Sequence, residues 1–197
     1  MSGMAGSDKV RHPSPAVKLT YDDFVRFPDD GQRHELIDGE HYVTAAPNVR
    51  HQAIVGNFYL IIRSWLEDHP LGRVFLSPFD VVFSDFDVVE PDLLYLSNER
   101  AAQVLTPLHA NGVPELLIEI ISKSTRTRDE TIKRDLYQRM GVSEYLVIDP
   151  QLDLIHIHRR DGSAFCAPIE LSRERSDVIA SPLLPGLSLP LVRIFKE

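Results

Sequence analysis

The stretch that decides the fold is Pro114-Glu115-Leu116-Leu117-Ile118-Glu119-Ile120-Ile121, followed by Ser122. Its apolar run is too short for a helix and is bounded by a proline and a serine, which predicts a strand from Leu116 to Ile121 that is buried on both faces. Glu119 is the only charge within this run. A buried, isolated carboxylate is costly unless it is paired, protonated or bound to a metal, so Glu119 is the first candidate functional residue.

The chain after this strand predicts a helix and a second strand. Thr127 to Met140 places Ile132, Leu136 and Met140 on one stripe, and Gly141 ends the helix. Tyr145 to Ile148 follows as a buried strand, and we expect Leu154 to His158 to pair with it across Asp149-Pro150. A strand, a helix and a strand in this order predict a right-handed parallel crossover.

The chain before this strand contains both helical and strand patterns. A long helix from His51 to Glu67 is predicted by its apolar spacing, with Asn48 as its cap. The other expected elements are a short helix at Tyr21 to Phe27, a hairpin of His34 to Ile37 and His41 to Thr44 around Asp38-Gly39, and strands at Arg73 to Leu76, Val81 to Phe83 and Val88 to Leu96. The residues after Pro182 predict turns and a final edge strand. The fold class is therefore α/β (α+β), with a mixed central β-sheet flanked by the two long helices.

Length and composition indicate one soluble domain. The chain has 197 residues, 43% of them hydrophobic and 25% charged. Residues 1–17 are rich in Ser, Gly and Pro and are expected to be a disordered tail before a single domain at 18–197. The single cysteine, Cys166, excludes an internal disulfide and favours a cytoplasmic location. We find neither a membrane-spanning stretch nor a signal peptide.

The charge of the chain is unevenly distributed. The formal net charge is −8, which at first argues against a phosphate-rich partner. Residues 1–119, however, carry 9 basic against 18 acidic side chains, whereas residues 120–149 carry 6 against 5 and residues 150–197 carry 6 against 6. The acidity therefore ends at Glu119, where a basic segment begins.

A second acid lies in a similar apolar setting. Asp92 follows Glu90-Pro91 within the predicted strand from Val88 to Leu96. Two inward carboxylates from one sheet would form an oxygen-ligand site suited to a hard cation such as Mg²⁺. The alternative is that each acid lies at a strand end and pairs with a surface arginine.

The segment after Glu119 concentrates hydroxyls and cations at the start of a helix. It reads Ser122-Lys123-Ser124-Thr125-Arg126-Thr127-Arg128-Asp129, and a phosphate is favoured in such a place. Arg126 and Arg128 are candidates for phosphate contacts, or they simply solvate a loop. Lys133 either reaches the strand of Glu119 or pairs with Asp129 on a solvated face.

Several of these elements together resemble a known family. They are His34 to Glu40, Glu90-Pro91-Asp92, Leu117 to Ser122, Lys133 with Tyr137, and Gly141 to Pro150, with Leu183 to Leu187 near the end. Their order and spacing over about residues 20 to 195 resemble the Uma-type "putative restriction endonuclease" family of the PD-(D/E)XK nuclease superfamily. The resemblance implies a restriction-endonuclease-like core, a DNA substrate and a divalent metal, Mg²⁺ or Mn²⁺.

The resemblance also implies roles for particular residues. Asp92 and Glu119 would match the two motif acids, and Glu35 would be an additional acid of the metal shell, although it could also be an exposed hairpin residue. Ile121 stands where the superfamily has lysine, and Lys133 is the candidate replacement. The accessory candidates are Ser122, Lys123, His51 and Arg126.

Three functional readings stay open at this point. The first is a Mg²⁺-dependent deoxyribonuclease, expected to act as a homodimer because dimers commonly cut two strands. The second is a nucleic-acid-binding module with a degraded site, which the Ile121 departure favours. The third is a metal-dependent hydrolase of another phosphodiester, such as RNA or a nucleotide. His156 and His158 are expected on the solvent face of their strand, not in a zinc site.

Overall fold

The computed structural model describes residues 17–196, so the expected tail lies outside the described residues except for Val17. The helices are α1 (Tyr21–Phe24), α2 (Val49–Asp68), α3 (Asn98–Val104), α4 (Arg134–Met140) and α5 (Leu191–Ile194), and a π-helical segment, η1 (Arg128–Lys133), leads directly into α4. None of the helices in residues 17–196 has the length and apolar character that crossing a membrane requires.

The strands form two main sheets. The larger sheet has the order β11-β10-β9-β8-β6-β3, and β12 also pairs with β10. Its strands are β3 (Gly72–Leu76), β6 (Leu93–Ser97), β8 (Leu116–Ile120), β9 (Glu144–Asp149), β10 (Leu154–Asp161), β11 (Ala164–Phe165) and β12 (Ile169–Ser172). β8 and β9 are parallel and are connected through η1 and α4, as the crossover prediction requires, whereas the other pairs in this sheet are antiparallel.

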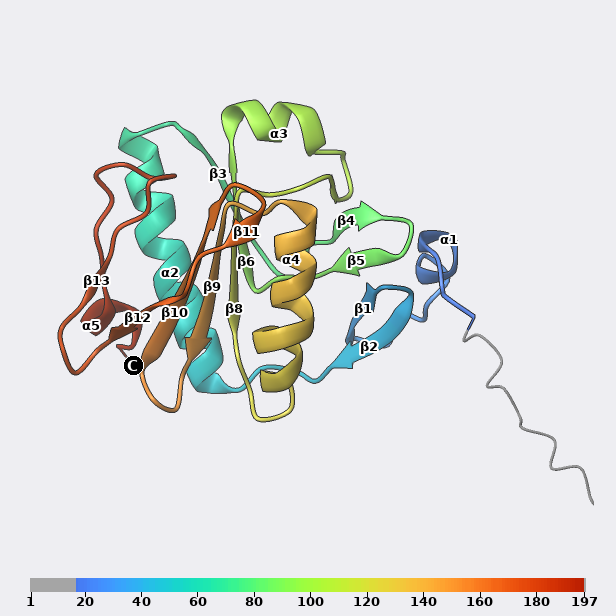
Figure 1. The fold of residues 1–197 in the computed structure, drawn as a ribbon, viewed down its shortest axis with the longest axis horizontal. Helices are drawn as coiled ribbons and strands as arrows, with labels where there is room; N and C mark the ends of the chain where they lie inside the picture. The colour runs from blue at the N-terminus through green and yellow to red at the C-terminus, as the bar shows by residue number, and fades with distance from the viewer. Residues whose placement is uncertain (1–16, 197) are drawn as a thin grey trace, which may run out of the picture.

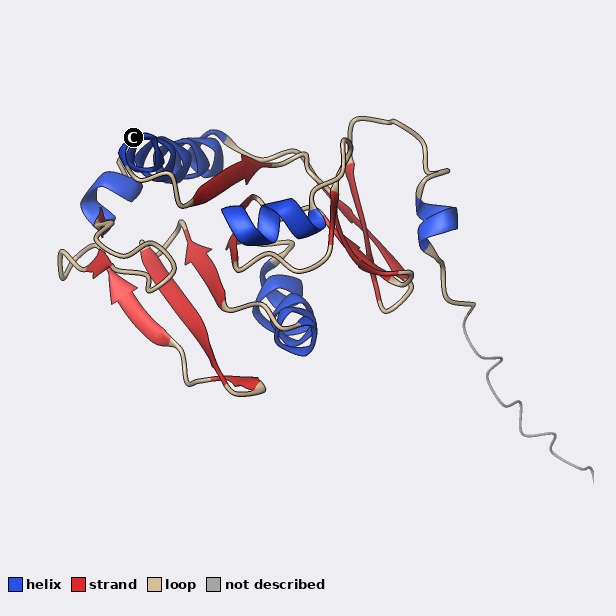
Figure 2. Ribbon diagram, turned by 90° about the horizontal axis from the view of Figure 1, so that it is seen from above, coloured by secondary structure: helices blue, strands red, loops and turns tan. Residues whose placement is uncertain are grey.

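The smaller sheet has the order β2-β1-β5-β4-β7 and lies at one end of the larger one (Figure 1, Figure 2). It contains β1 (Arg33–Ile37), β2 (Glu40–Thr44), β4 (Val81–Ser84), β5 (Asp87–Val89) and β7 (Ala110–Asn111). The predicted hairpin is confirmed. Asp38 and Gly39 adopt positive φ angles of 53° and 76°, which a two-residue turn needs in order to match the right-handed twist of the two strands that it joins. A further pair, β13 (Val178–Ile179) and β14 (Leu189–Pro190), completes the C-terminal segment.

The two long helical segments cover opposite faces of the larger sheet (Figure 1). Ile54, Phe58 and Ile62 of α2 pack with Leu116, Ile118 and Ile120, which are alternate residues of β8. Leu117 faces the other side and packs with Leu136 and Tyr137 of α4. The mixed sheet between two helices confirms the predicted fold class. Because successive side chains of a strand point to opposite faces of the sheet, Glu119 lies on the same face as Leu117, which is the face covered by α4.

The structure corrects two sequence predictions. The expected strand from Val88 to Leu96 is two strands in different sheets, β5 and β6, because Pro91 has no N–H group to donate to a ladder. The predicted stripe of the second helix is also wrong at its start: Ile132 is exposed, whereas Asp129 and Lys133 are buried. The buried residues of this segment still recur at ordinary helical spacing, but on a face that is offset from the apolar stripe, because Asp129 and Lys133 are buried through ion pairs rather than apolar contacts.

Candidate active site

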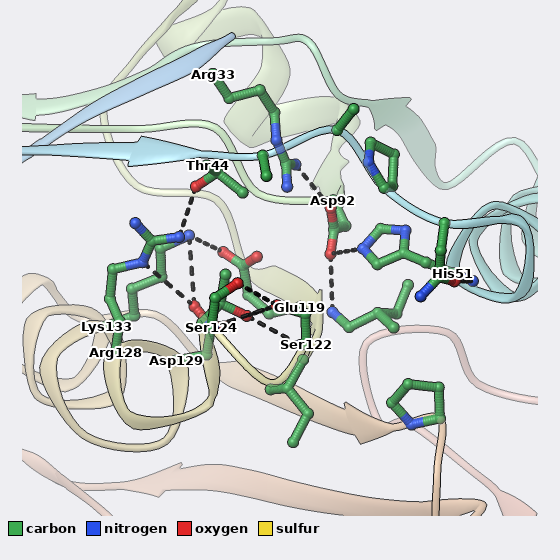
Figure 3. A pocket seen from close by; sticks show the side chains of 18 residues that line it. Arg33, Thr44, His51, Asp92, Glu119, Ser122, Ser124, Arg128, Asp129 and Lys133 are labelled. Atoms are coloured by element: carbon green, nitrogen blue, oxygen red, sulfur yellow. Dashed lines mark hydrogen bonds and ion pairs between the residues drawn. The ribbon is translucent and has the colours of Figure 1, made fainter.

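A cavity of about 140 Å³ lies where the two sheets meet the start of η1 (Figure 3). Its walls come from several parts of the chain: Arg33 of β1, residues 44–51 from the end of β2 to the start of α2, Asp92 before β6, residues 119–133 from the end of β8 through η1, and Pro150. The charged and titratable side chains that line it are Arg33, His51, Asp92, Glu119, Arg128, Asp129 and Lys133. Segments far apart in the sequence thus bring seven such groups around one small space.

Asp92 and Glu119 come from adjacent strands. Leu93 of β6 pairs with Ile118 of β8 in antiparallel register, so Asp92 lies directly opposite Glu119. Asp92 immediately precedes β6, and both side chains are almost fully buried, at 1% and 3% exposure. The sequence prediction that two carboxylates meet on one sheet is therefore the geometry observed.

Asp92 is held by three donors. Arg33 Nη1 donates to Asp92 Oδ1 at 2.7 Å, while Asp92 Oδ2 accepts the Ile120 N–H at 2.8 Å and contacts His51 Nε2 at 3.0 Å. Burial alone would raise the pKa of Asp92, but the hydrogen bond and charge of His51 and the charge of Arg33 lower this pKa to about 2. Asp92 is therefore an anion of fixed orientation.

Glu119 contacts groups from the helix above it. Lys133 Nζ and Tyr137 Oη each donate to Glu119 Oε1 at 2.8 Å. Oε2 receives no hydrogen bond from residues 17–196, so one oxygen of this buried carboxylate is available to a ligand. Burial raises the pKa of Glu119 to about 8, and the neighbouring acids Asp129 and Asp92 add to this shift against the opposing charge of Lys133.

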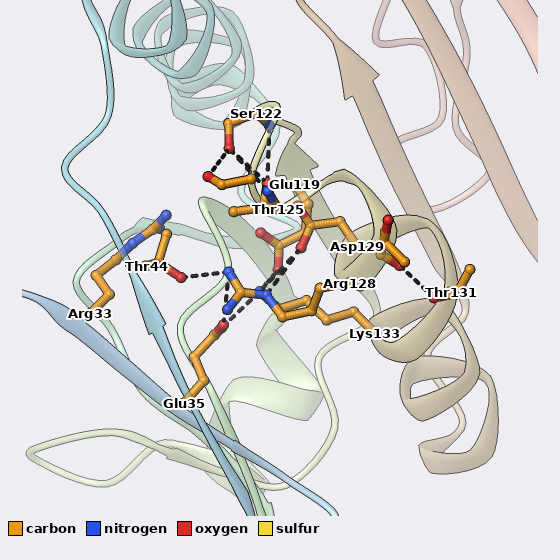
Figure 4. Close-up of polar contacts among 12 residues, drawn as sticks. Arg33, Glu35, Thr44, Glu119, Ser122, Thr125, Arg128, Asp129, Thr131 and Lys133 are labelled. Atoms are coloured by element: carbon orange, nitrogen blue, oxygen red, sulfur yellow. Dashed lines mark hydrogen bonds and ion pairs between the residues drawn. The ribbon is translucent and has the colours of Figure 1, made fainter.

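Lys133 lies at the centre of an acidic cluster (Figure 4). Its Nζ is 2.7 Å from Glu35 Oε1 as well as 2.8 Å from Glu119 Oε1, and Asp129 Oδ1 is 3.9 Å away. Burial would lower the pKa of Lys133, but the charges of Glu119, Glu35 and Asp129 outweigh it and hold the pKa above its ordinary value. Lys133 is thus a permanent cation that reaches the strand of Glu119, and it does not lie on a solvated face.

Glu35 is buried on β1 and is not an exposed hairpin residue. Its Oε1 accepts the Glu90 N–H at 3.0 Å and contacts Lys133, whereas its Oε2 is buried without a hydrogen bond among the described residues. Glu35 is not among the residues that line the cavity. Glu35 therefore contacts Lys133 without lining the cavity, which suits a residue that fixes the position of the lysine amine.

The other predicted residues divide between the cavity and the surface. His51 and Ser122 line the cavity, and Ile121 lines it while packing into the core. Lys123 is exposed and does not line it. Arg126 pairs with Glu130 at 3.0 Å and with Asp149 at 2.7 Å, outside the cavity.

Sequence reasoning missed Arg33 and the inward position of Asp129. Arg33 is two positions before Glu35 on one strand, and period-two alternation could have placed both on the site face. Asp129 carried a weaker signal, because an acid four positions before a lysine is typical of an exposed ion pair on a helix surface.

The carboxylates of the cavity are candidate ligands for a divalent cation. Residues 17–196 contain no group of three or more His, Cys, Asp or Glu side chains that could hold a metal ion. Mg²⁺, however, is commonly held by one or two carboxylates with water and substrate phosphate, and Asp92 with Glu119 provides such a pair of hard oxygen ligands. Glu119 Oε2 accepts no hydrogen bond from residues 17–196, which leaves one carboxylate oxygen of the pair available to a cation. The residues present therefore fit a hard divalent cation.

Comparison with known proteins agrees with this geometry. The sequence model of the Uma2 family, described as "Putative restriction endonuclease", matches residues 21–192. The chain belongs to the Uma2 family. A solved structure similar to this chain is that of a "putative nuclease belonging to DUF820" from Anabaena variabilis, with a TM-score of 0.75 and 20% identity over 90% of this chain and 97% of that one.

The solved structure shares the fold, and the Uma2 description indicates an enzyme of the nuclease type. No curated protein matches the chain.

Proposed function

We propose that this Uma2 protein is an endonuclease that hydrolyses DNA phosphodiester bonds with a divalent cation, Mg²⁺ or Mn²⁺, held by Asp92 and Glu119. The observation that carries the proposal is the pair of buried carboxylates on paired strands, with Lys133 Nζ 2.8 Å from Glu119 in the same cavity. In this proposal Asp92, Glu119 and Lys133 correspond to the acid, acid and lysine set of the PD-(D/E)XK nucleases, with the lysine supplied by η1.

Each residue has a definite task in this proposal. The bound cation would polarise a phosphoryl oxygen and lower the pKa of a water molecule. Lys133 offers a fixed positive charge to the attacking water and to the charge that develops on the phosphate. Arg33 and His51 hold Asp92 in one orientation. Glu35, expected as a third metal ligand, contacts Lys133 and is proposed to position it.

The degraded-module reading rested on Ile121, which occupies the usual place of the lysine. Because Lys133 brings an amine to Glu119 from the following helix, the site keeps a lysine although Ile121 occupies the position of the motif lysine. Hydrolysis of RNA or a nucleotide by the same residues stays an alternative that substrate comparison decides. A cytoplasmic, homodimeric enzyme is part of the proposal, and the free, exposed Cys166 suits a reducing compartment.

The test is a cleavage assay with purified protein on plasmid DNA, RNA and a small phosphodiester, with Mg²⁺, Mn²⁺ or EDTA. We expect metal-dependent DNA cleavage and a loss of about 100-fold or more in Asp92→Asn and Glu119→Gln. Arg175→Gln is the matched control, because Arg175 pairs with Glu170 and Asp177 on the surface. Full, EDTA-sensitive cleavage by both acid variants would overturn the assignment. Light scattering of the same samples measures the oligomeric state.

A further inference from the structure

Arg128 differs from the other arginines near the cavity in how little of its hydrogen-bonding capacity is used. A guanidinium has five N–H donors. Within residues 17–196, Arg128 makes one hydrogen bond, from Nη2 to Thr44 Oγ1 at 2.5 Å. Its Nε is buried without a hydrogen-bond partner. Arg33 and Arg126, by contrast, each donate to a carboxylate at 2.7 Å.

The position of Arg128 is restricted although only one of its donors makes a hydrogen bond among residues 17–196. Its side chain is only 10% exposed, and its guanidinium lies 5.6 Å from the centre of the Tyr42 ring. The nearest carboxylate oxygens, on Glu35 and Asp129, are 3.7 and 3.8 Å away, beyond hydrogen-bond distance. Tyr42 and Thr44 of β2 therefore hold the guanidinium in place, while its other N–H groups have no hydrogen-bond acceptor in the described part of the chain.

Arg128 faces the space in which a substrate would lie. It lines the same cavity as Asp92 and Glu119, and Figure 3 shows it on one side of this carboxylate pair, with His51 on the other. Buried guanidinium donors without acceptors are costly, and a planar guanidinium matches two oxygens of a phosphate.

Formal charges around the cavity support an anionic ligand. The charged residues that line the cavity are three carboxylates (Asp92, Glu119 and Asp129) and three cations (Arg33, Arg128 and Lys133). A bound divalent cation would give this lining a net positive charge, which would favour an anionic group such as a phosphodiester.

We propose that Arg128 forms a phosphoryl-binding subsite, in which its guanidinium donates to the non-bridging oxygens of the phosphodiester group of a nucleic acid. This proposal rests on the proposed function and adds the residue that binds the substrate phosphate. The cation of Lys133, in contrast, is directed at Glu119 and Glu35, so the two side chains have separate tasks.

The experiment measures binding of a short labelled DNA duplex, and of the matching RNA, by fluorescence anisotropy at several salt concentrations. Ca²⁺ replaces Mg²⁺, and a gel checks that the strands stay intact. We expect Arg128→Gln to weaken binding by about tenfold or more and to reduce the slope of log K against log salt by about 0.9, the value for one lost phosphate contact. Arg175→Gln should leave both unchanged.

Two further variants and a stability measurement separate phosphate binding from a structural role. Arg128→Lys keeps the charge but not the fork of donors, so it should weaken binding and keep the salt slope. Thr44→Val removes the hydroxyl that holds the guanidinium and should weaken binding less than Arg128→Gln does. Thermal unfolding verifies that each variant is folded, and if Arg128→Gln fails to fold, Arg128→Lys decides by its affinity.

The outcomes distinguish the two proposals. If Arg128→Gln folds and binds DNA with the affinity and salt slope of the wild-type protein, the subsite proposal is wrong and the proposed function still stands. If Arg128→Gln does not fold, wild-type affinity in Arg128→Lys has the same meaning. If the wild-type protein binds neither DNA nor RNA, the proposed function itself fails.

Discussion

Lys133 Nζ lies 2.8 Å from Glu119 Oε1, although the two residues are 14 positions apart in the chain. The contact is possible because η1 turns Lys133 toward the sheet, while Ile121, the residue two positions after Glu119, packs into the core. The amine beside the second acid therefore comes from a helix, and its position depends on the local winding of that helix.

Lys133→Gln tests how much this contact contributes. The substitution leaves Glu35 and Glu119 buried without their common cation, and breaking a buried ion pair costs about 3–5 kcal/mol. We expect urea unfolding to show a loss of this size. Cleavage measured on the folded fraction should fall by about 100-fold or more. A loss of stability below about 1 kcal/mol would show that the buried network is weaker than its geometry indicates.

Metal binding should also be visible without any cleavage. A ligand that binds only the folded state stabilises it, by about 2.7 kcal/mol at a concentration 100 times its dissociation constant. We therefore expect Mn²⁺ to raise the melting temperature of the wild-type protein and EDTA to reverse the change. The same titration of Glu119→Gln is the comparison. An equal Mn²⁺ shift in both proteins would place the cation elsewhere.

The sequence predicted the elements that depend on local pattern. The apolar run at Leu116–Ile120, the Asp38-Gly39 turn and the Asn48 cap all act within a few residues, and each is where it was expected. Asp92 and Glu119 were recognisable because each interrupts an apolar stretch.

The remaining features could not be read from local pattern. The burial of Asp129 and the exposure of Ile132 depend on which face of the segment packs against the sheet, and the apolar stripe of Ile132, Leu136 and Met140 does not reveal a face that is held by ion pairs. Arg33 meets Asp92 across 59 positions, through the junction of two sheets. Strand alternation indicates the face on which Arg33 lies, but no local pattern specifies its partner.

Two glycines in different surroundings predict opposite effects of an added methyl group on stability. Gly56 lies on the exposed face of α2, and a Cβ there would meet nothing within 4 Å, so Gly56→Ala should stabilise the protein by about 0.5–1 kcal/mol. Gly72 begins β3, where a Cβ would overlap the Leu96 carbonyl oxygen and the Tyr95 ring. Gly72→Ala should therefore destabilise by about 1–3 kcal/mol. Urea midpoints of the two variants provide the measurement, and equal midpoints would contradict the described packing.

His158 predicts how stability depends on pH. Contrary to the sequence prediction of a solvent-facing residue, its side chain is buried and stacks on the Tyr145 ring, with centroids 5.9 Å apart. Burial, together with the charges of Arg134 and His156, lowers its pKa from 6.5 to about 4. Between these two pH values the unfolded chain binds a proton that the folded protein does not, so folding stability falls as the pH decreases through this range.

The comparison that isolates His158 is His158→Phe, which keeps the ring and removes the titration. Both proteins lose stability in acid because their carboxylates also titrate, so the measured quantity is the difference between their free energies of unfolding. At about pH 7.5 this difference reflects packing alone, because His158 is neutral in both states. At about pH 4.5 it should have moved in favour of the variant, since the unfolded wild-type chain gains a proton there. A difference that stays constant between the two pH values would mean that His158 takes up its proton as readily in the folded protein as in the unfolded chain.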